Sequence, residues 1–102
     1  MKDNRVNFDN LIYFPMQEKL YFDDKNLKLR HTHNLIIRQA LQSEGMPVSK
    51  FELYKFIWPK DIDVHINKLD THLTNLKNLL KENLKYDFLF KSQSSQITFL
   101  IN

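Results

Sequence analysis

The sequence predicts an α+β domain, in which a small N-terminal antiparallel sheet is followed by three helices and a C-terminal β-hairpin. Three observations carry this prediction. Apolar and polar residues alternate over 27–30, as in a strand with one buried face. Large aliphatic residues recur at steps of three and four over 61–82, as along one side of a helix. Two apolar runs around a polar centre span 88–101, which is the pattern of a hairpin.

The composition is that of one folded domain. With 102 residues, 42% of them hydrophobic, the chain is long enough to bury a core without a disulfide. Cysteine is absent and no stretch is long and apolar enough to span a membrane, so we expect a cytoplasmic protein with no membrane partner. The net charge of +3 permits an anionic partner without requiring one. The single glycine excludes the glycine-rich loops that cradle phosphates.

The N-terminal part of the chain divides into a polar start and a strand region. Residues 1–7 have few apolar anchors, so we expect a linker or a disordered terminus there and a folded domain over 8–102. Pro15 and the polar run that follows the second apolar stretch indicate turns. Three short strands are therefore predicted: 11–14, 20–22 and 27–30.

Three helices are predicted in the middle of the chain. The first begins with Thr32 as its N-cap and ends at Gly45, where a left-handed cap is favoured. The second begins with a capping box made by Ser49 and Glu52, and it ends at the next proline. A tight connection of the helix-turn-helix kind then leads to the third helix, 61–82.

The predicted helix 61–82 has two contrasting sides. Six aliphatic side chains form a stripe that we expect in the core: Ile62, Ile66, Leu69, Leu73, Leu76 and Leu80. The opposite side carries side chains that form hydrogen bonds: Asp63, Asn67, Lys68, Asp70, Thr71, Thr74, Asn75 and Asn78. Such a face has the donors and acceptors to read base edges, but any surface helix also needs a polar side. From the residues alone both interpretations stay open.

Catalytic and metal chemistry find little support. His31 and His33 alternate in an extended stretch, and His65 and His72 lie seven residues apart without any thiolate, which is not the pattern of a metal site. The acids of the long helix are accompanied by no nucleophile or oxyanion hole. We therefore expect no enzyme activity, no cofactor, no metal and no small-molecule substrate.

Particular residues at particular spacings resemble the winged-helix DNA-binding domain of the OmpR/PhoB-type response regulators. The run 63–73 is similar to the recognition helix of that family, vDvHI.rLR.kL, and 27–29 resembles the strand before its first helix. Five further residues match the second helix, v.S...L...vW: Val48, Ser49, Glu52, Leu53 and Trp58. The resemblance implies a winged helix-turn-helix fold.

The same resemblance implies the DNA-binding domain of a bacterial transcription regulator from a two-component system. Helix 61–82 would enter the major groove of double-stranded DNA, and the hairpin 88–101, called the wing, would reach the minor groove. RNA polymerase or a second copy of the chain would be further partners. An upstream receiver domain is also implied, and the linker-like first residues favour an excised domain. The matching positions give these DNA contacts: Thr32, Val64, Asn67, Lys68, Thr71, Lys91, Ser92, Gln93 and Ser94.

Three features depart from the family pattern. Asn67, Asp70 and Thr71 stand where the family tends to place arginines, and the wing lacks the glycine turn RG.GY. The predicted connection after Trp58 is shorter than the family loop that engages RNA polymerase. A second hypothesis therefore stays open, in which the winged helix serves as a protein–protein interaction module.

Overall fold

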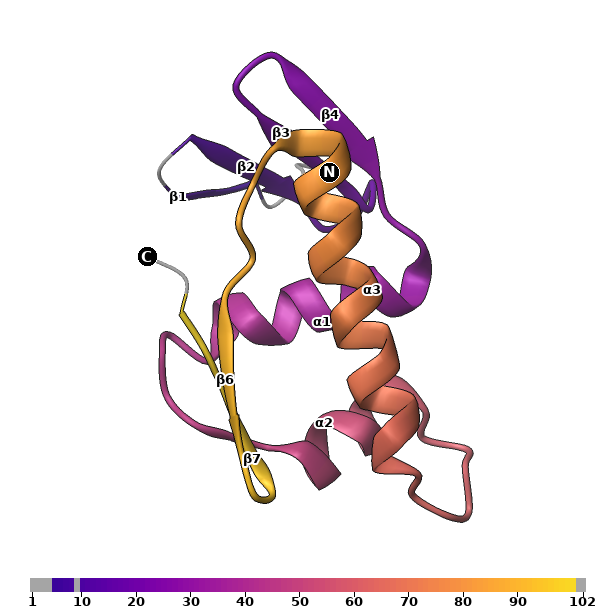
Figure 1. Cartoon of the computed structure of the whole chain (residues 1–102). Helices are drawn as coiled ribbons and strands as arrows, with labels where there is room; N and C mark the ends of the chain where they lie inside the picture. The colour runs from indigo at the N-terminus through magenta and orange to yellow at the C-terminus, as the bar shows by residue number, and fades with distance from the viewer. Residues whose placement is uncertain (1–4, 9, 101–102) are drawn as a thin grey trace.

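The chain folds in the predicted order of sheet, helices and hairpin (Figure 1). The structure is a computed structural model, and it describes residues 5–8 and 10–100. The N-terminal strands are β1 (Val6–Phe8), β2 (Leu11–Phe14), β3 (Lys19–Phe22) and β4 (Lys25–Lys28). The helices are α1 (His31–Gln42), α2 (Lys50–Ile57) and α3 (Ile66–Leu84). The remaining strands are β5 (Val48–Ser49), β6 (Phe90–Gln93) and β7 (Gln96–Phe99).

The N-terminal sheet is an antiparallel meander in the order β1-β2-β3-β4. Strand β4 begins earlier than the predicted strand 27–30, because Asp23 adopts a left-handed φ of 55° and closes a tight turn directly after β3. Strand β1 was not predicted, since the expected linker 1–7 overlaps it. Val6 and Asn7 of that segment pair with β2, and residues 1–4 lie outside the described residues.

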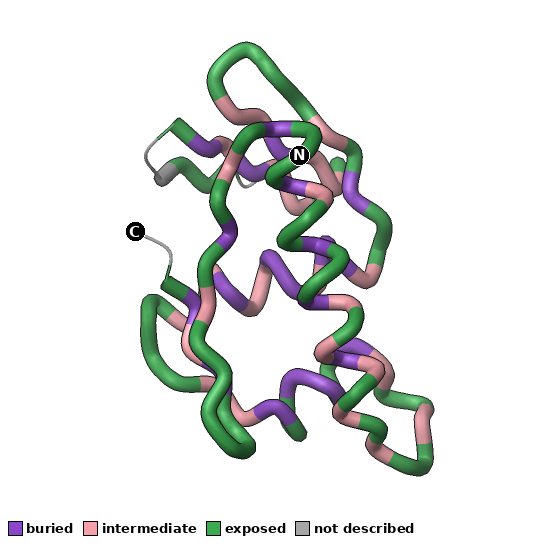
Figure 2. The backbone as a smooth tube through the Cα atoms, viewed as in Figure 1, coloured by how far each residue is buried: buried purple, intermediate pink, exposed green. Residues whose placement is uncertain are grey.

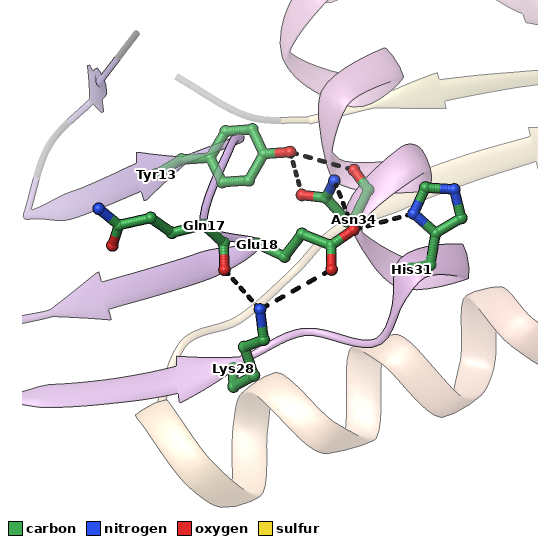
Figure 3. Close-up of polar contacts among 6 residues, drawn as sticks. All are labelled: Tyr13, Gln17, Glu18, Lys28, His31 and Asn34. Atoms are coloured by element: carbon green, nitrogen blue, oxygen red, sulfur yellow. Dashed lines mark hydrogen bonds and ion pairs between the residues drawn. The ribbon is translucent and has the colours of Figure 1, made fainter. Parts of the chain in front are cut away.

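A polar network joins the N-terminal sheet to the start of α1 (Figure 3). The Tyr13 hydroxyl of β2 donates a hydrogen bond to Oδ1 of Asn34, and Nδ2 of Asn34 donates to Oε2 of Glu18 at 3.3 Å. Nδ1 of His31 lies 2.9 Å from the same Glu18 oxygen. This hydrogen bond is the largest influence that lowers the pKa of the Glu18 carboxyl. The network links β2 and the turn after it to the first turn of α1.

The core lies between the helices and the two sheets, and the buried segments of α1 and α3 face one another there (Figure 2). Helix α3 contributes a fully buried stripe of leucines: Leu69, Leu73, Leu76, Leu80 and Leu84. The second sheet has the order β5-β7-β6. On its side of the core, the rings of Phe88, Phe90 and Phe99 pack against one another at centroid distances of 5.7 to 6.3 Å. None of the helices within residues 5–8 and 10–100 is long and apolar enough to cross a membrane.

Helix α3 begins and ends later than the predicted helix 61–82. Residues 58–65 form a loop, so the predicted tight connection is wrong. Ile62 is 94% exposed and does not belong to the buried stripe, although its spacing matches that stripe. At the other end, Lys85 takes a left-handed φ of 58° and its amide donates to carbonyls of the last turn, which stops the helix.

Helix α1 also differs from its prediction at both ends. Its N-cap is Arg30, whose side chain makes no capping hydrogen bond, so the assignment of Thr32 as the cap is wrong. The helix ends at Gln42, three residues before Gly45. Gly45 does have the predicted left-handed backbone, with a φ of 81°, but it lies in the loop and follows Glu44, which is left-handed too.

Candidate nucleic-acid interface

Helix α2 is fixed at both ends by local chemistry. The Ser49 hydroxyl accepts a hydrogen bond from the amide of Glu52 at 3.2 Å, which confirms the predicted N-cap. At the other end the Trp58 amide donates to the carbonyl of Tyr54, and Pro59 cannot extend the helix. Leu53 and Tyr54 are fully buried. The helix is therefore held rigidly beside α3.

Asp61 anchors the loop 58–65 between α2 and α3. Its Oδ2 accepts hydrogen bonds from the Tyr54 hydroxyl at 2.6 Å and from Nζ of Lys68 at 3.0 Å, and its backbone carbonyl accepts one from Lys55 at 2.7 Å. The Tyr54 hydrogen bond, followed by that from Lys68, lowers the pKa of the Asp61 carboxyl. These contacts explain why the chain does not become helical at Asp61, as the sequence predicted.

Lys68 lies on the side of α3 that faces this loop. Its Nζ is 4.2 Å from the centre of the Trp58 ring and 5.7 Å from that of Tyr54, in addition to its ion pair with Asp61. The ammonium group is thus already surrounded by a carboxylate and two aromatic faces. Contact of Lys68 with a phosphate or a base would require breaking these interactions.

Lys50, the first residue of α2, connects three elements. Its side chain is only 8% exposed, and Nζ lies 3.4 Å from Oδ1 of Asp70 in α3. Its backbone amide donates to the Ser95 carbonyl, in the turn of the wing, at 2.8 Å. Asp70 is therefore the counterion of a buried lysine. Sequence reasoning missed this pair, because its partners are 20 residues apart and belong to different helices.

The outer face of α3 is the set of exposed, uncharged polar side chains opposite its leucine stripe: Asn67, Thr71, Thr74, Asn75 and Asn78. Within the part of the chain that the structure describes, none of these five side chains forms a hydrogen bond or an ion pair. Of the predicted contacts, Asn67 and Thr71 lie together on this face. Val64 precedes the helix and packs, partly buried, against the core.

The wing is a tighter hairpin than the sequence pattern predicts. Most of the expected polar centre 91–96 belongs to β6 and β7, and Gln93 pairs with Gln96 across a two-residue turn. Ser94 has a left-handed φ of 51° in this turn, a conformation that glycine adopts more readily. All four predicted wing contacts are exposed: Lys91, Ser92, Gln93 and Ser94. Strand β5, which was not predicted, adds a third strand beside β7.

The position of Thr32 is different from that of the other predicted contacts. It lies in the first turn of α1 and is partly buried, whereas the remaining candidates belong to α3, the loop before it and the wing. The structure therefore does not bring Thr32 onto the outer face of α3.

Two histidine rings, the buried His33 and the partly buried His72, lie next to each other between α1 and α3. His33 is only 4% exposed and neither of its ring nitrogens has a hydrogen-bond partner, while the His72 ring is 6.3 Å from it and 5.1 Å from the Trp58 ring. Burial, with a smaller effect of the Arg30 charge, lowers the pKa of His33 to about 4. Burial also lowers the pKa of His72. In residues 5–8 and 10–100 no group of three His, Asp or Glu side chains is placed to hold a metal ion.

Comparison with known proteins supports the fold. The sequence matches no protein-family model and no curated protein. Among solved structures, the DNA-binding domain of E. coli CadC is similar, with a TM-score of 0.77 at 17% sequence identity. The match covers 99% of this chain and 96% of that chain. The predicted winged-helix fold is thereby confirmed.

Proposed function

We propose that this winged helix binds double-stranded DNA and is the DNA-binding domain of a transcription regulator. In this proposal α3 lies in the major groove and the wing contacts the neighbouring minor groove. The observation that carries it is the outer face of α3, which is exposed, polar and free of internal partners. The fold that the chain shares with a solved DNA-binding domain adds support.

The dimensions of the elements are compatible with this arrangement. An α-helix with side chains is about 10–12 Å wide and the major groove about 12 Å, so α3 can enter with its outer face toward the bases. The Ser95 carbonyl is bonded to the start of α2, which holds the wing beside the helix-turn-helix unit. Exposed side chains of the wing, Lys91 and Gln93 among them, can then contact phosphate or sugar.

One observation favours a second candidate, a protein–protein interaction module. Lys50 and Lys68 are engaged inside the protein, and Asp63 is exposed just before α3. These two cations are therefore not free to displace counterions from DNA, and counterion release is the main source of affinity in most DNA-binding proteins. The two candidates predict different responses to DNA, so a single experiment separates them.

The test compares two variants that each replace an exposed asparagine by glutamate. Asn67→Glu places a negative charge in the first turn of α3, where it would repel phosphates but stabilise the helix through its dipole. Asn26→Glu makes the same change in β4, in the N-terminal sheet. We expect Asn67→Glu to weaken binding to a mixed-sequence duplex by about tenfold or more, and Asn26→Glu to change it little.

NMR titration of the labelled chain, at low and at near-physiological salt, provides the readout. Chemical-shift changes centred on Asn67, Thr71 and the turn of the wing would support the proposal. Equal losses in both variants would mean that the outer face of α3 is not the contact surface. Absence of any shift at low salt would refute DNA binding and favour the interaction module.

A further inference from the structure

The outer face of α3 carries amides that can pair bidentately with adenine, and it carries no arginine or lysine for the corresponding contact with guanine. Asn67, Thr71 and Asn75 recur every four residues and are all exposed, so they lie on one line along the helix. Asn78 follows one turn later on the same side. From Asn67 to Asn78 this line is composed of amides and a hydroxyl with a methyl group, and the charged Glu82 follows one turn after Asn78.

Cations that could read guanine are absent from this line. Arginine or lysine recognises guanine by donating to its O6 and N7. No arginine follows Arg38 anywhere in the sequence. Lys68 is engaged by Asp61 and Trp58, and Lys77 lies about a third of a turn away from the line of amides.

The side chains that are present match adenine and thymine. An asparagine amide can accept from N6 and donate to N7 of adenine at the same time, and a threonine methyl can pack on the methyl group of thymine. Successive positions on the line are about 6 Å apart along the helix, since each residue rises about 1.5 Å. That distance corresponds to roughly two base pairs. Asn67, Thr71 and Asn75 would thus sample a run of about four base pairs.

We propose that the outer face of α3 selects A·T base pairs through the major groove, with Asn67, Thr71 and Asn75 as the residues that determine specificity. This inference rests on the proposed DNA binding and makes it more specific. Each well-placed amide contact would discriminate between base pairs by roughly tenfold. The neutral face gives little sequence-independent attraction, so this discrimination would form a large part of the observed binding.

The test measures binding of the full chain, by fluorescence anisotropy at low salt, to duplexes of equal length that differ only in their central base pairs. One centre is all A·T, one all G·C and one all inosine·C. An inosine·C pair presents the major-groove edge of G·C but the minor-groove edge of A·T. We expect the A·T duplex to bind at least about tenfold more tightly than both of the others.

Variants and modified bases assign the preference to individual groups. Asn75→Ala should reduce affinity for the A·T duplex and leave the G·C affinity within about twofold, while Asn75→Arg should shift the preference toward G·C. Asn26→Ala in β4 is the matched control and should change neither. Replacement of the central adenines by 7-deazaadenine, which lacks the N7 acceptor, should weaken binding as Asn75→Ala does.

The outcomes separate this inference from the proposed function. Equal binding to all three duplexes, or a preference for G·C, would overturn the inference and leave DNA binding intact. If inosine·C binds as tightly as A·T, the minor groove is the discriminating surface and the assignment to α3 is wrong. Binding to none of the duplexes at low salt would refute the proposed function itself.

Discussion

The buried His33 makes the stability of the fold depend on pH. In the folded chain its pKa is about 4, against 6.5 for an unperturbed histidine, because burial disfavours the charged ring. Between these two values the unfolded state binds a proton that the folded state does not. The stabilising effect of keeping His33 neutral is thus fully present above pH 6.5 and is lost as the pH falls toward 4.

The size of this effect follows from the gap between the two pKa values. Each pH unit in the window costs about 1.4 kcal/mol, so the full gap corresponds to about 3 kcal/mol of unfolding free energy. Relaxation and water entry around the charged ring lower such penalties, so we take about 2 kcal/mol as the expected loss. Because small domains are stable by about 5–15 kcal/mol, the loss is large and should lower the melting temperature by about 10 °C.

The assay is urea denaturation followed by Trp58 fluorescence at a series of pH values from 8 to 4. We expect the midpoint to fall steadily below pH 6.5. His33→Phe keeps an aromatic ring in the buried position but cannot be protonated, so its curve should be flatter over the same range. His65→Gln replaces an exposed histidine and should follow the unmodified chain. The same pH dependence in His33→Phe would refute the role of His33.

Two further predictions concern the engaged lysines. Asp70→Asn removes the counterion of the buried Lys50 and should reduce stability to urea by about 1–2 kcal/mol, less than for a fully buried pair because the Asp70 side chain is 47% exposed. Lys50→Met should be close to neutral, and a loss as large as that of Asp70→Asn would mean that the charge pairing is not the cause. Lys68→Ala should leave the salt dependence of DNA binding unchanged, whereas a slope shallower by about one would show that Lys68 reaches a phosphate.

Local signals account for the parts of the fold that sequence reasoning predicted. A short apolar and aromatic run stopped by Pro15 located β2, and the capping chemistry of Ser49 located the start of α2. The period of the leucines from Leu69 to Leu80 located the buried side of α3. Each of these signals lies within a few residues of the structure that it determines, so no knowledge of the rest of the chain was needed.

The parts that were missed depend on contacts between distant residues. Ile62 continues the helical period of the leucines, yet it lies in the loop before α3. The hydrogen bonds from Tyr54 and Lys68 to Asp61 keep this loop from becoming part of the helix. The sequence pattern marks Asp70 as an acid on a polar face, and only the packing of α2 on α3 reveals its partner Lys50. Of the candidate site, the sequence could therefore predict which polar residues follow the helical period, but not which of them are already occupied.

Which of these side chains are already paired within the protein decides what kind of DNA binding the surface can support. Lys50 and Lys68 are engaged in ion pairs and help to hold α2, the loop and the wing in place, and the side chains of the outer face of α3 are uncharged. A rigid neutral face gains little from counterion release, so its affinity would depend on matching hydrogen bonds at base edges. A weak dependence on salt combined with a strong dependence on sequence is therefore the expected signature of this chain. A strong dependence on salt with a weak dependence on sequence would instead indicate that other surface lysines contact the DNA.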